Sequence, residues 1–92
     1  MMSNELLENL NQLHTTPMGV DRIRRNLGLG EEIEDVVLWC RKKIESPDVR
    51  ITRKGKNWYC ETDGCIITVN AHSYTLITAH TESGINDFLQ RN

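Results

Sequence analysis

The hydrophobic pattern of the sequence changes its period once, near Ser46 and Pro47. Before this point apolar residues recur at helical spacing, most clearly in the stripe Ile33, Val36, Val37, Cys40 and Ile44. After it, short runs rich in β-branched and aromatic residues alternate with turn residues, which predicts strands. Strands joined by such short turns pair antiparallel. The pattern therefore predicts an α+β fold with about three N-terminal helices, at 3–45, packed on one face of a four-stranded antiparallel sheet at 49–80.

Local signals set the limits of the predicted helices. Ser3 is the expected N-cap of the first helix, which ends near His14. Thr16 and Pro17 predict the start of the second helix, and Gly28 predicts its end. The first helix carries its apolar side at Leu6, Leu7, Leu10 and Leu13, and the second at Val20, Ile23 and Leu27.

Four strands are predicted at 49–53, 57–62, 65–70 and 74–80. Asp63 and Gly64 indicate a type I′ turn, which pairs Trp58 with Val69. This register predicts a core face with Trp58, Cys60, Cys65, Ile67 and Val69. It leaves Tyr59, Glu61, Ile66, Thr68 and Asn70 on a face open to solvent or to a partner.

The last hairpin has two possible registers. A two-residue loop at His72 and Ser73 turns Tyr74, Leu76, Thr78 and His80 inward. A three-residue loop turns Thr75, Ile77 and Ala79 inward and places Thr78 and His80 on the open face. We favour the second register because Ile77 and Ala79 form the better core set.

The chain is short enough to predict a single domain, 1–92, with a tail at 81–92 that either adds a short helix or stays loose. With 38% hydrophobic and 26% charged residues it has the composition of a globular domain. We see no signal peptide and no membrane span, so we expect a cytoplasmic protein without a membrane partner. The oligomeric state is left open.

The three cysteines are expected to be reduced and buried as small apolar residues. Cys60 and Cys65 lie in neighbouring strands and Cys40 on a helix, without the paired spacing of a zinc site. We therefore expect no metal and no cofactor.

The net charge of −2 is unevenly distributed. Residues 36–56 include seven basic and two acidic residues, a net charge of +5. Such a stretch is compatible with phosphate contacts, and Tyr59 could stack on a base. An equally simple interpretation is a set of solvated faces and an edge strand protected by charge. The candidate nucleic-acid-binding residues are Arg24, Arg50, Arg53, Lys54, Lys56 and Tyr59.

Histidines are the natural acids and bases for RNA cleavage without metal. The candidate catalytic residues are His14, Thr78 and His80. Each histidine also has a structural interpretation: His14 as the C-terminal residue of a helix, His80 as a strand end, and His72 as a polar turn residue. His72 and His80 would lie about 15–20 Å apart along the strand, too far to share a metal.

The segments HTTPMGVDRIRRNL and RKGKNWYCETDGCIITVNAHSYTLITAH resemble an uncharacterised family of small bacterial proteins, a domain of unknown function with an Asn-Ala-His motif at residues 70–72. The resemblance covers residues 5–81 and implies no activity. More distantly, His14-Thr15, Pro47-Asp48 and the final strand at 77–80 are similar to the ribonuclease toxin superfamily of barnase, colicins and RelE-type toxins. That resemblance implies an enzyme that activates a ribose 2′-OH without metal.

These observations leave functions of different classes open. We favour a small cytoplasmic module that binds RNA, or a protein that processes nucleic acids, through a basic open sheet face. The first alternative is a metal-independent endoribonuclease of the toxin type. A further alternative is a mobile-element protein that inhibits a host nuclease by binding it.

Overall fold

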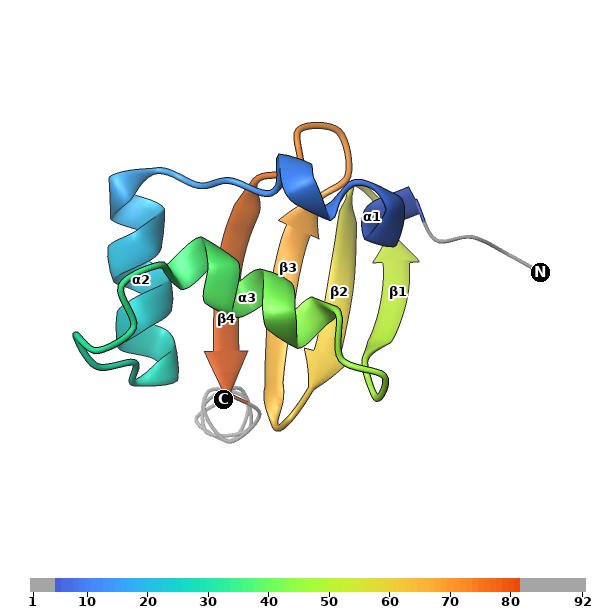
Figure 1. Ribbon diagram of the computed structural model, residues 1–92. Coiled ribbons are helices and arrows are strands. Elements are labelled where there is room, and N and C mark those ends of the chain that lie inside the picture. The colour runs from blue at the N-terminus through green and yellow to red at the C-terminus, as the bar shows by residue number, and fades with distance from the viewer. Residues whose placement is uncertain (1–4, 82–92) are drawn as a thin grey trace, which may run out of the picture.

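The structure, a computed structural model, describes residues 5–81 and confirms an α+β fold (Figure 1). The expected N-cap Ser3 and the possible C-terminal helix lie outside the described residues. The elements are α1 Glu5–Glu8, a 3₁₀ helix η1 Leu10–Gln12, α2 Pro17–Leu27, α3 Val36–Ile44, β1 Arg50–Lys54, β2 Asn57–Thr62, β3 Cys65–Asn70 and β4 Leu76–Thr81. The four strands form one antiparallel sheet in the order β1-β2-β3-β4.

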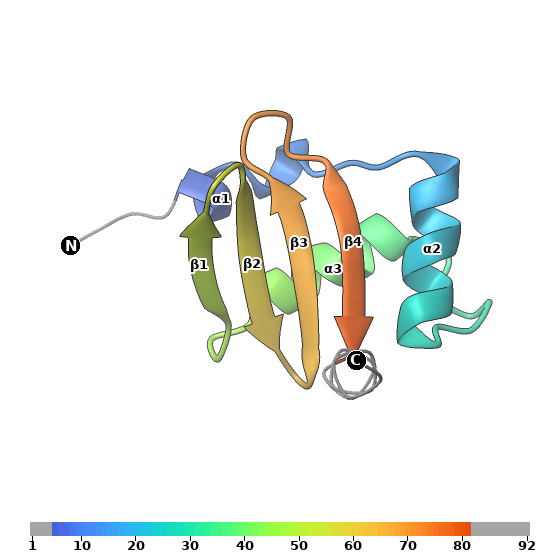
Figure 2. The same ribbon diagram turned by 180° about the vertical axis from the view of Figure 1, so that it is seen from behind.

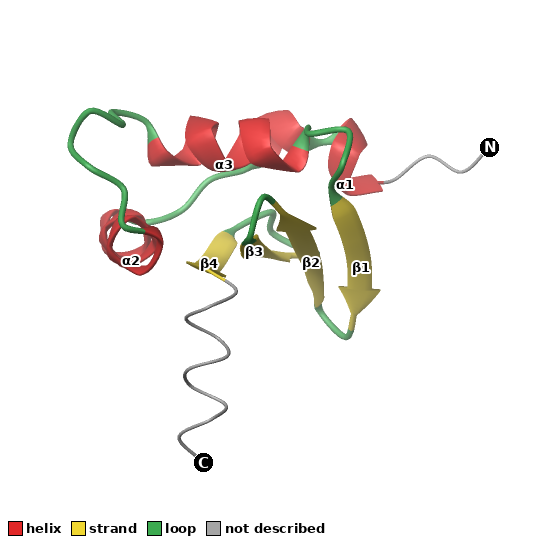
Figure 3. Ribbon diagram, turned by 90° about the horizontal axis from the view of Figure 1, so that it is seen from below, coloured by secondary structure: helices red, strands yellow, loops and turns green. Residues whose placement is uncertain are grey.

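The described helices do not lie symmetrically about the sheet. Figure 3 shows α3 and α1 on one side of the sheet, whereas α2 lies beside the edge strand β4. Figure 2 shows the opposite face of the sheet, in front of which no described helix lies. The arrangement therefore leaves one open face and treats the two sheet edges differently.

The predicted first helix is interrupted. Asn9 separates α1 from η1, and its side-chain amide donates to the Glu5 carbonyl at 2.8 Å. This bond uses a carbonyl that a continuous helix would pair with a backbone N–H, a competition typical of asparagine. Three of the four predicted apolar residues are nevertheless buried: Leu6, Leu10 and Leu13.

The predicted limits of α2 are confirmed. The hydroxyl of Thr16 accepts a hydrogen bond from the Gly19 N–H at 3.0 Å, and Gly28 ends the helix with a φ of 66°. In α3, Asp35 is the N-cap and accepts from the Leu38 N–H at 2.9 Å. The buried side chains of the two helices come from the predicted stripes: Ile23 of α2, and Val36, Cys40 and Ile44 of α3.

The predicted register of the central hairpin is confirmed, because Trp58 pairs with Val69 and Thr62 with Cys65. Asp63 and Gly64 both have positive φ, as a type I′ turn requires. All five residues of the predicted core face are buried: Trp58, Cys60, Cys65, Ile67 and Val69.

Neither predicted loop for the last hairpin is correct. Asn70 pairs with Thr75 around a four-residue loop, because its side-chain oxygen accepts from the N–H groups of His72 and Ser73 at 2.9 Å each. Tyr74 takes a positive φ of 60°, and its buried ring stacks near Trp58 with 5.5 Å between centroids.

A bulge in β4 then changes the register between its two halves. Leu76 pairs with Val69, but Ala79 pairs with Ile67, so Ile77 is an extra residue. Leu76 and Ala79 are buried, whereas Ile77 is not among the side chains packed on the core. The inward placement predicted for Ala79 is therefore confirmed, whereas the inward placement predicted for Thr75 and Ile77 is wrong. His80 shares the open face with its partner Ile66.

Candidate functional site

The strand register arranges the open face as three cross-strand rows. The first row contains Arg50, Glu61, Ile66 and His80. The second contains Thr52, Tyr59, Thr68 and Thr78. The third contains Lys54, Asn57, Asn70 and Thr75. The cations stand at the β1 side of this face and the two candidate catalytic residues of β4 stand at the other.

An open depression of about 510 Å³ lies on this face over β1, β2 and β3. It is lined by Thr52, Lys54, Tyr59, Glu61 and Ile66. The Tyr59 ring is half-buried, and its hydroxyl is 3.4 Å from the Asn57 amide that donates to it. The depression therefore combines an aromatic ring, an aliphatic side chain and an exposed ammonium group.

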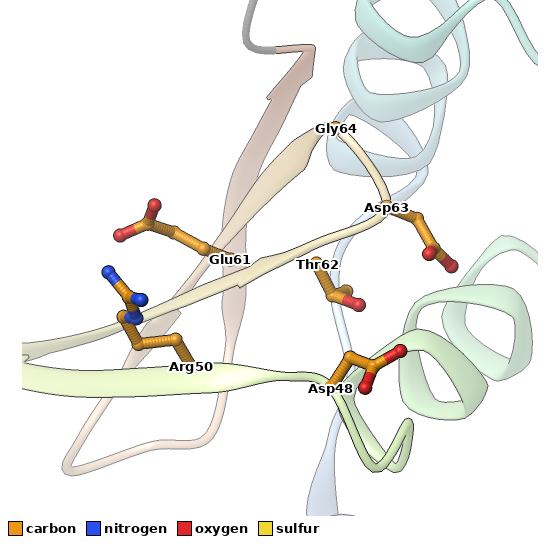
Figure 4. A pocket seen from close by; sticks show the side chains of 6 residues that line it. All are labelled: Asp48, Arg50, Glu61, Thr62, Asp63 and Gly64. Carbon is orange, nitrogen blue, oxygen red and sulfur yellow. The ribbon is translucent and has the colours of Figure 1, made fainter.

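A second hollow, of about 280 Å³, lies at the end of the β2–β3 hairpin. Figure 4 shows the Arg50 and Glu61 side chains extending to one side of the strands, and those of Asp48, Thr62 and Asp63 on the other. Asp63 forms an ion pair with Lys43 of α3 at 3.0 Å. Arg50 and Glu61 are directly opposite in the ladder, so an acidic residue stands beside the first cation of the open face.

The predicted basic residues do not form one patch. Arg50 and Lys54 lie on the open face, but Arg53 pairs with Trp58 and lies over its ring at 5.5 Å, on the side of the core. Lys56 is in the turn between β1 and β2, where its carbonyl accepts from the Ala71 N–H at 2.7 Å. Among the described residues the rows of the open face hold two cations and one carboxylate, much less than the charge of the linear stretch.

Arg24 lies on α2, beyond the other edge of the sheet. Its guanidinium donates to the Gly30 carbonyl at 2.6 Å and so holds the loop after α2. This placement separates Arg24 from the cations of β1 by the full width of the sheet, about 14 Å for three strand spacings.

His14 does not end a helix as one interpretation had it. It forms a parallel bridge with Thr75: its N–H donates to the Tyr74 carbonyl at 3.2 Å, and its carbonyl accepts from the Leu76 N–H at 2.8 Å. The exposed imidazole contacts the Thr75 hydroxyl through Nε2 at 3.2 Å. His14 thus stands at the start of β4, outside the third row.

Thr78 and His80 are brought together near the far end of β4. The Thr78 hydroxyl is 3.4 Å from Nε2 of His80, and the Asn26 amide of α2 donates to the same hydroxyl at 3.4 Å. His14 pairs with Thr75, which precedes Thr78 by three residues and His80 by five, or about 10 and 16 Å along the strand. The structure therefore joins two of the three candidate catalytic residues and separates the third from them.

His72 is exposed in the last loop, where its backbone N–H binds the Asn70 side chain. The Ser73 hydroxyl donates to the same Asn70 oxygen at 3.1 Å. This network confirms that His72 is a turn residue. It also gives Asn70 a structural role in closing the loop.

The three cysteines are free and buried, as predicted. Burial, together with the neighbouring thiols, raises the pKa of Cys40 and of Cys60 to about 12. Thiols held protonated in this way are weak nucleophiles and poor metal ligands. Residues 5–81 contain no group of three or more His, Cys, Asp or Glu side chains placed to hold a metal ion.

Several residues that lie on this face or contact it were not among the sequence candidates: Thr52, Glu61 and Ile66 on the face, and Asn26 of α2. Glu61 and Ile66 were predicted to lie on the open face but were given no role. The two-residue loop at Gly55 and Lys56 also predicts that Thr52 lies on the open face, because this loop pairs Thr52 with Tyr59. No local pattern connects Asn26 to Thr78, which lies 52 residues later.

None of the described helices is long and apolar enough to cross a membrane. Neither the curated proteins nor the solved structures include one that matches the chain. The model of one protein family does match, over residues 7–80, which include every described strand except the last residue of β4. The chain therefore belongs to this family, the proteins of unknown function DUF3781.

Proposed function

We propose that this protein is a binding module for single-stranded RNA and that its ligand lies across the open sheet face. The observation that carries the proposal is the depression in which Tyr59 and Ile66 lie beside Lys54. Single-stranded RNA exposes bases that stack on aromatic rings and phosphates that bind cations. A face without a covering helix among the described residues offers room for both.

The rows suggest how such a strand would be held. Tyr59 stands in the middle row, with Arg50 and Lys54 on the neighbouring strand at either side of it. Bases would stack on Tyr59 and Ile66, and the phosphates would follow the two cations along β1. Glu61, opposite Arg50, would hold the guanidinium in place and limit the binding of phosphate at that end. Three buried free thiols fit a reducing compartment such as the cytoplasm.

Binding of a fluorescent oligonucleotide at several salt concentrations tests this proposal. Because each phosphate contact on a single strand contributes about 0.7 to the salt slope, replacing both Arg50 and Lys54 by Gln should lower the slope by up to about 1.4. Tyr59→Ala should weaken binding by about 1–3 kcal/mol, the loss of one stacking contact.

Arg53→Gln and Lys42→Gln are the matched controls, because Arg53 covers Trp58 and Lys42 is an exposed residue of α3. Both should leave RNA affinity nearly unchanged. Equal weakening by these controls would show that the binding is electrostatic and not specific to the open face. Absence of binding at low salt would reject the proposal.

A metal-independent endoribonuclease is the second candidate, favoured by the contact between Thr78 and His80. Such an enzyme would act with this pair, since His14 lies at the other end of β4. Loss of a general acid or base lowers cleavage by about 10²- to 10⁴-fold. RNA cleavage in the presence of a chelator that His80→Ala abolishes, and His72→Ala does not, would establish the enzyme.

A further inference from the structure

We propose that the outer edge of β1 is a docking site for an extended acidic segment of a partner protein, which would add a fifth strand to the sheet. The site consists of main-chain groups of Ile51 and Arg53 with the side chains of Arg50 and Lys54. It shares these two cations with the proposed RNA surface but differs from it in using the main-chain groups at the edge of the sheet.

The hairpin geometry identifies the free main-chain groups. A two-residue loop joins β1 to β2, so the flanking residues Lys54 and Asn57 form a hydrogen-bonded pair. The pairs then alternate, and the N–H and C=O groups of Arg53 and Ile51 point away from β2. No described residue binds to these groups, and no described element lies beyond β1 (Figure 2).

The side chains at this edge are suited to a strand with two different faces. On the core side, Val49 and Ile51 are half-buried and pack against the hydrophobic core, so the core ends at β1 without full cover. On the open side, Arg50 and Lys54 are exposed cations. An incoming strand would therefore place apolar side chains beside Ile51 and carboxylates beside the two cations.

The charges argue against one way in which a second copy of this chain could occupy the edge. Antiparallel pairing of two β1 strands centred on Thr52 would set Arg50 of each copy opposite Lys54 of the other. Like charges directly opposite destabilise a sheet pair. The same two cations favour a carboxylate opposite each of them in an added strand. The main-chain hydrogen bonds of β-strand addition would hold that strand in place.

Titration of isotope-labelled full-length protein with a capped Glu-Val-Glu-Val-Glu-Val-Glu peptide, followed by NMR, tests the proposal. The expected result is saturable binding with the largest amide shifts at Ile51 and Arg53. The double variant Arg50→Gln with Lys54→Gln should weaken binding at least about tenfold, the effect of one charge-assisted contact. Shifts centred away from β1 would overturn the proposal.

Two changes test the main-chain bonds separately from charge. Arg53→Pro removes an outward donor, which an edge strand tolerates, and Arg53→Gln removes the charge but keeps that donor. Proline should abolish binding and glutamine should reduce it by a few fold. Should the proline variant fail to fold, a peptide N-methylated at its valines makes the same test on the ligand. Equal binding of the methylated peptide, or of polyglutamate, would reject strand addition.

Tyr59→Ala distinguishes this site from the RNA surface, because the tyrosine lies on the open face and not at the edge. It should weaken RNA binding and leave peptide affinity unchanged. Loss of RNA binding in all forms with intact peptide binding would reject the proposed function alone. Binding of RNA with no peptide binding would reject the edge site alone.

Discussion

The two edges of the sheet are protected by different means. At the β4 edge, His14 pairs with the start of the strand, the Thr15 hydroxyl donates to the Leu76 carbonyl at 3.0 Å, and α2 lies alongside. At the β1 edge no described element pairs with the strand, and three of its four exposed residues are charged: Arg50, Arg53 and Lys54. Covering and charge are both ways to prevent uncontrolled pairing of an edge. The difference separates an edge that other parts of the fold cover from an edge that the described residues leave unpaired.

The same substitution on each side should reveal the largest difference. Ile23 of α2 is fully buried, whereas Ile51 of β1 is half-buried. We expect Ile23→Ala to lower the free energy of unfolding by about 2–5 kcal/mol, because it leaves a cavity where α2 meets the core. Ile51→Ala should cost clearly less. Urea unfolding measures both, and equal losses would show that the β1 edge is as tightly packed as the β4 side.

The stability of the protein at alkaline pH should depend on two buried thiols, one of which lies on the strand paired with β1. Cys60 is paired with Ile51 of β1, whereas Cys40 lies on α3. In both, the folded-state pKa is raised from 9.0 to about 12, so the unfolded chain releases its protons first. Stability is therefore retained below pH 9 and falls between pH 9 and 12, by about 1.4 kcal/mol per pH unit for each thiol.

Thiol alkylation at pH 8.5 separates the two cysteines. Both should react slowly in the folded protein because they are buried and protonated. Faster modification of Cys60 than of Cys40, located by mass spectrometry, would indicate that β1 opens locally. Cys40→Ala and Cys60→Ala serve as controls for the assignment of each rate.

A smaller effect is expected from the hydroxyl that closes the β4 edge. Thr15→Val keeps the shape of the side chain but removes the donor to the Leu76 carbonyl. The loss of this partly buried bond should cost about 1 kcal/mol. Thr52→Val on the exposed β1 strand is the matched control and should change stability by less than about 0.5 kcal/mol. Thermal unfolding measures the stability of both variants. Equal stability would show that the Thr15 hydroxyl does not help to hold the β4 edge.

The elements that were predictable carry their signals in adjacent residues. Thr16 and Pro17 mark the start of α2, and Asp63 with Gly64 specifies the turn that sets the central register. In the last hairpin the deciding features are the Asn70 side chain, which closes a four-residue loop, and the positive φ of Tyr74. The Tyr74 ring lies against Trp58, a contact that no spacing of apolar residues in the sequence indicates.

The candidate site was predictable only in part for the same reason. Tyr59 was placed on the open face because the hairpin register determines its side. The charge of residues 36–56 is instead divided by the fold, since Arg41 lies on α3 and neighbouring residues of β1 face opposite sides. His14 reaches Thr75 across 61 residues, and nothing local in the sequence indicates such a bridge.

The smallest effect on stability, and the sharpest test of the comparison, is expected from neutralising β1. Replacing Arg50 and Lys54 by Thr leaves the buried contacts intact, so unfolding of the monomer should change by less than about 0.5 kcal/mol. Arg53 would then be the one charged residue left in β1, and two copies could pair through the main chains of Ile51 and Arg53. We therefore expect the variant, but not the wild type, to sediment partly as a dimer at high concentration. Adding Arg53→Pro should return it to the monomer, because the outward donor is lost. A variant that stays monomeric without the proline would mean that features other than charge protect the β1 edge.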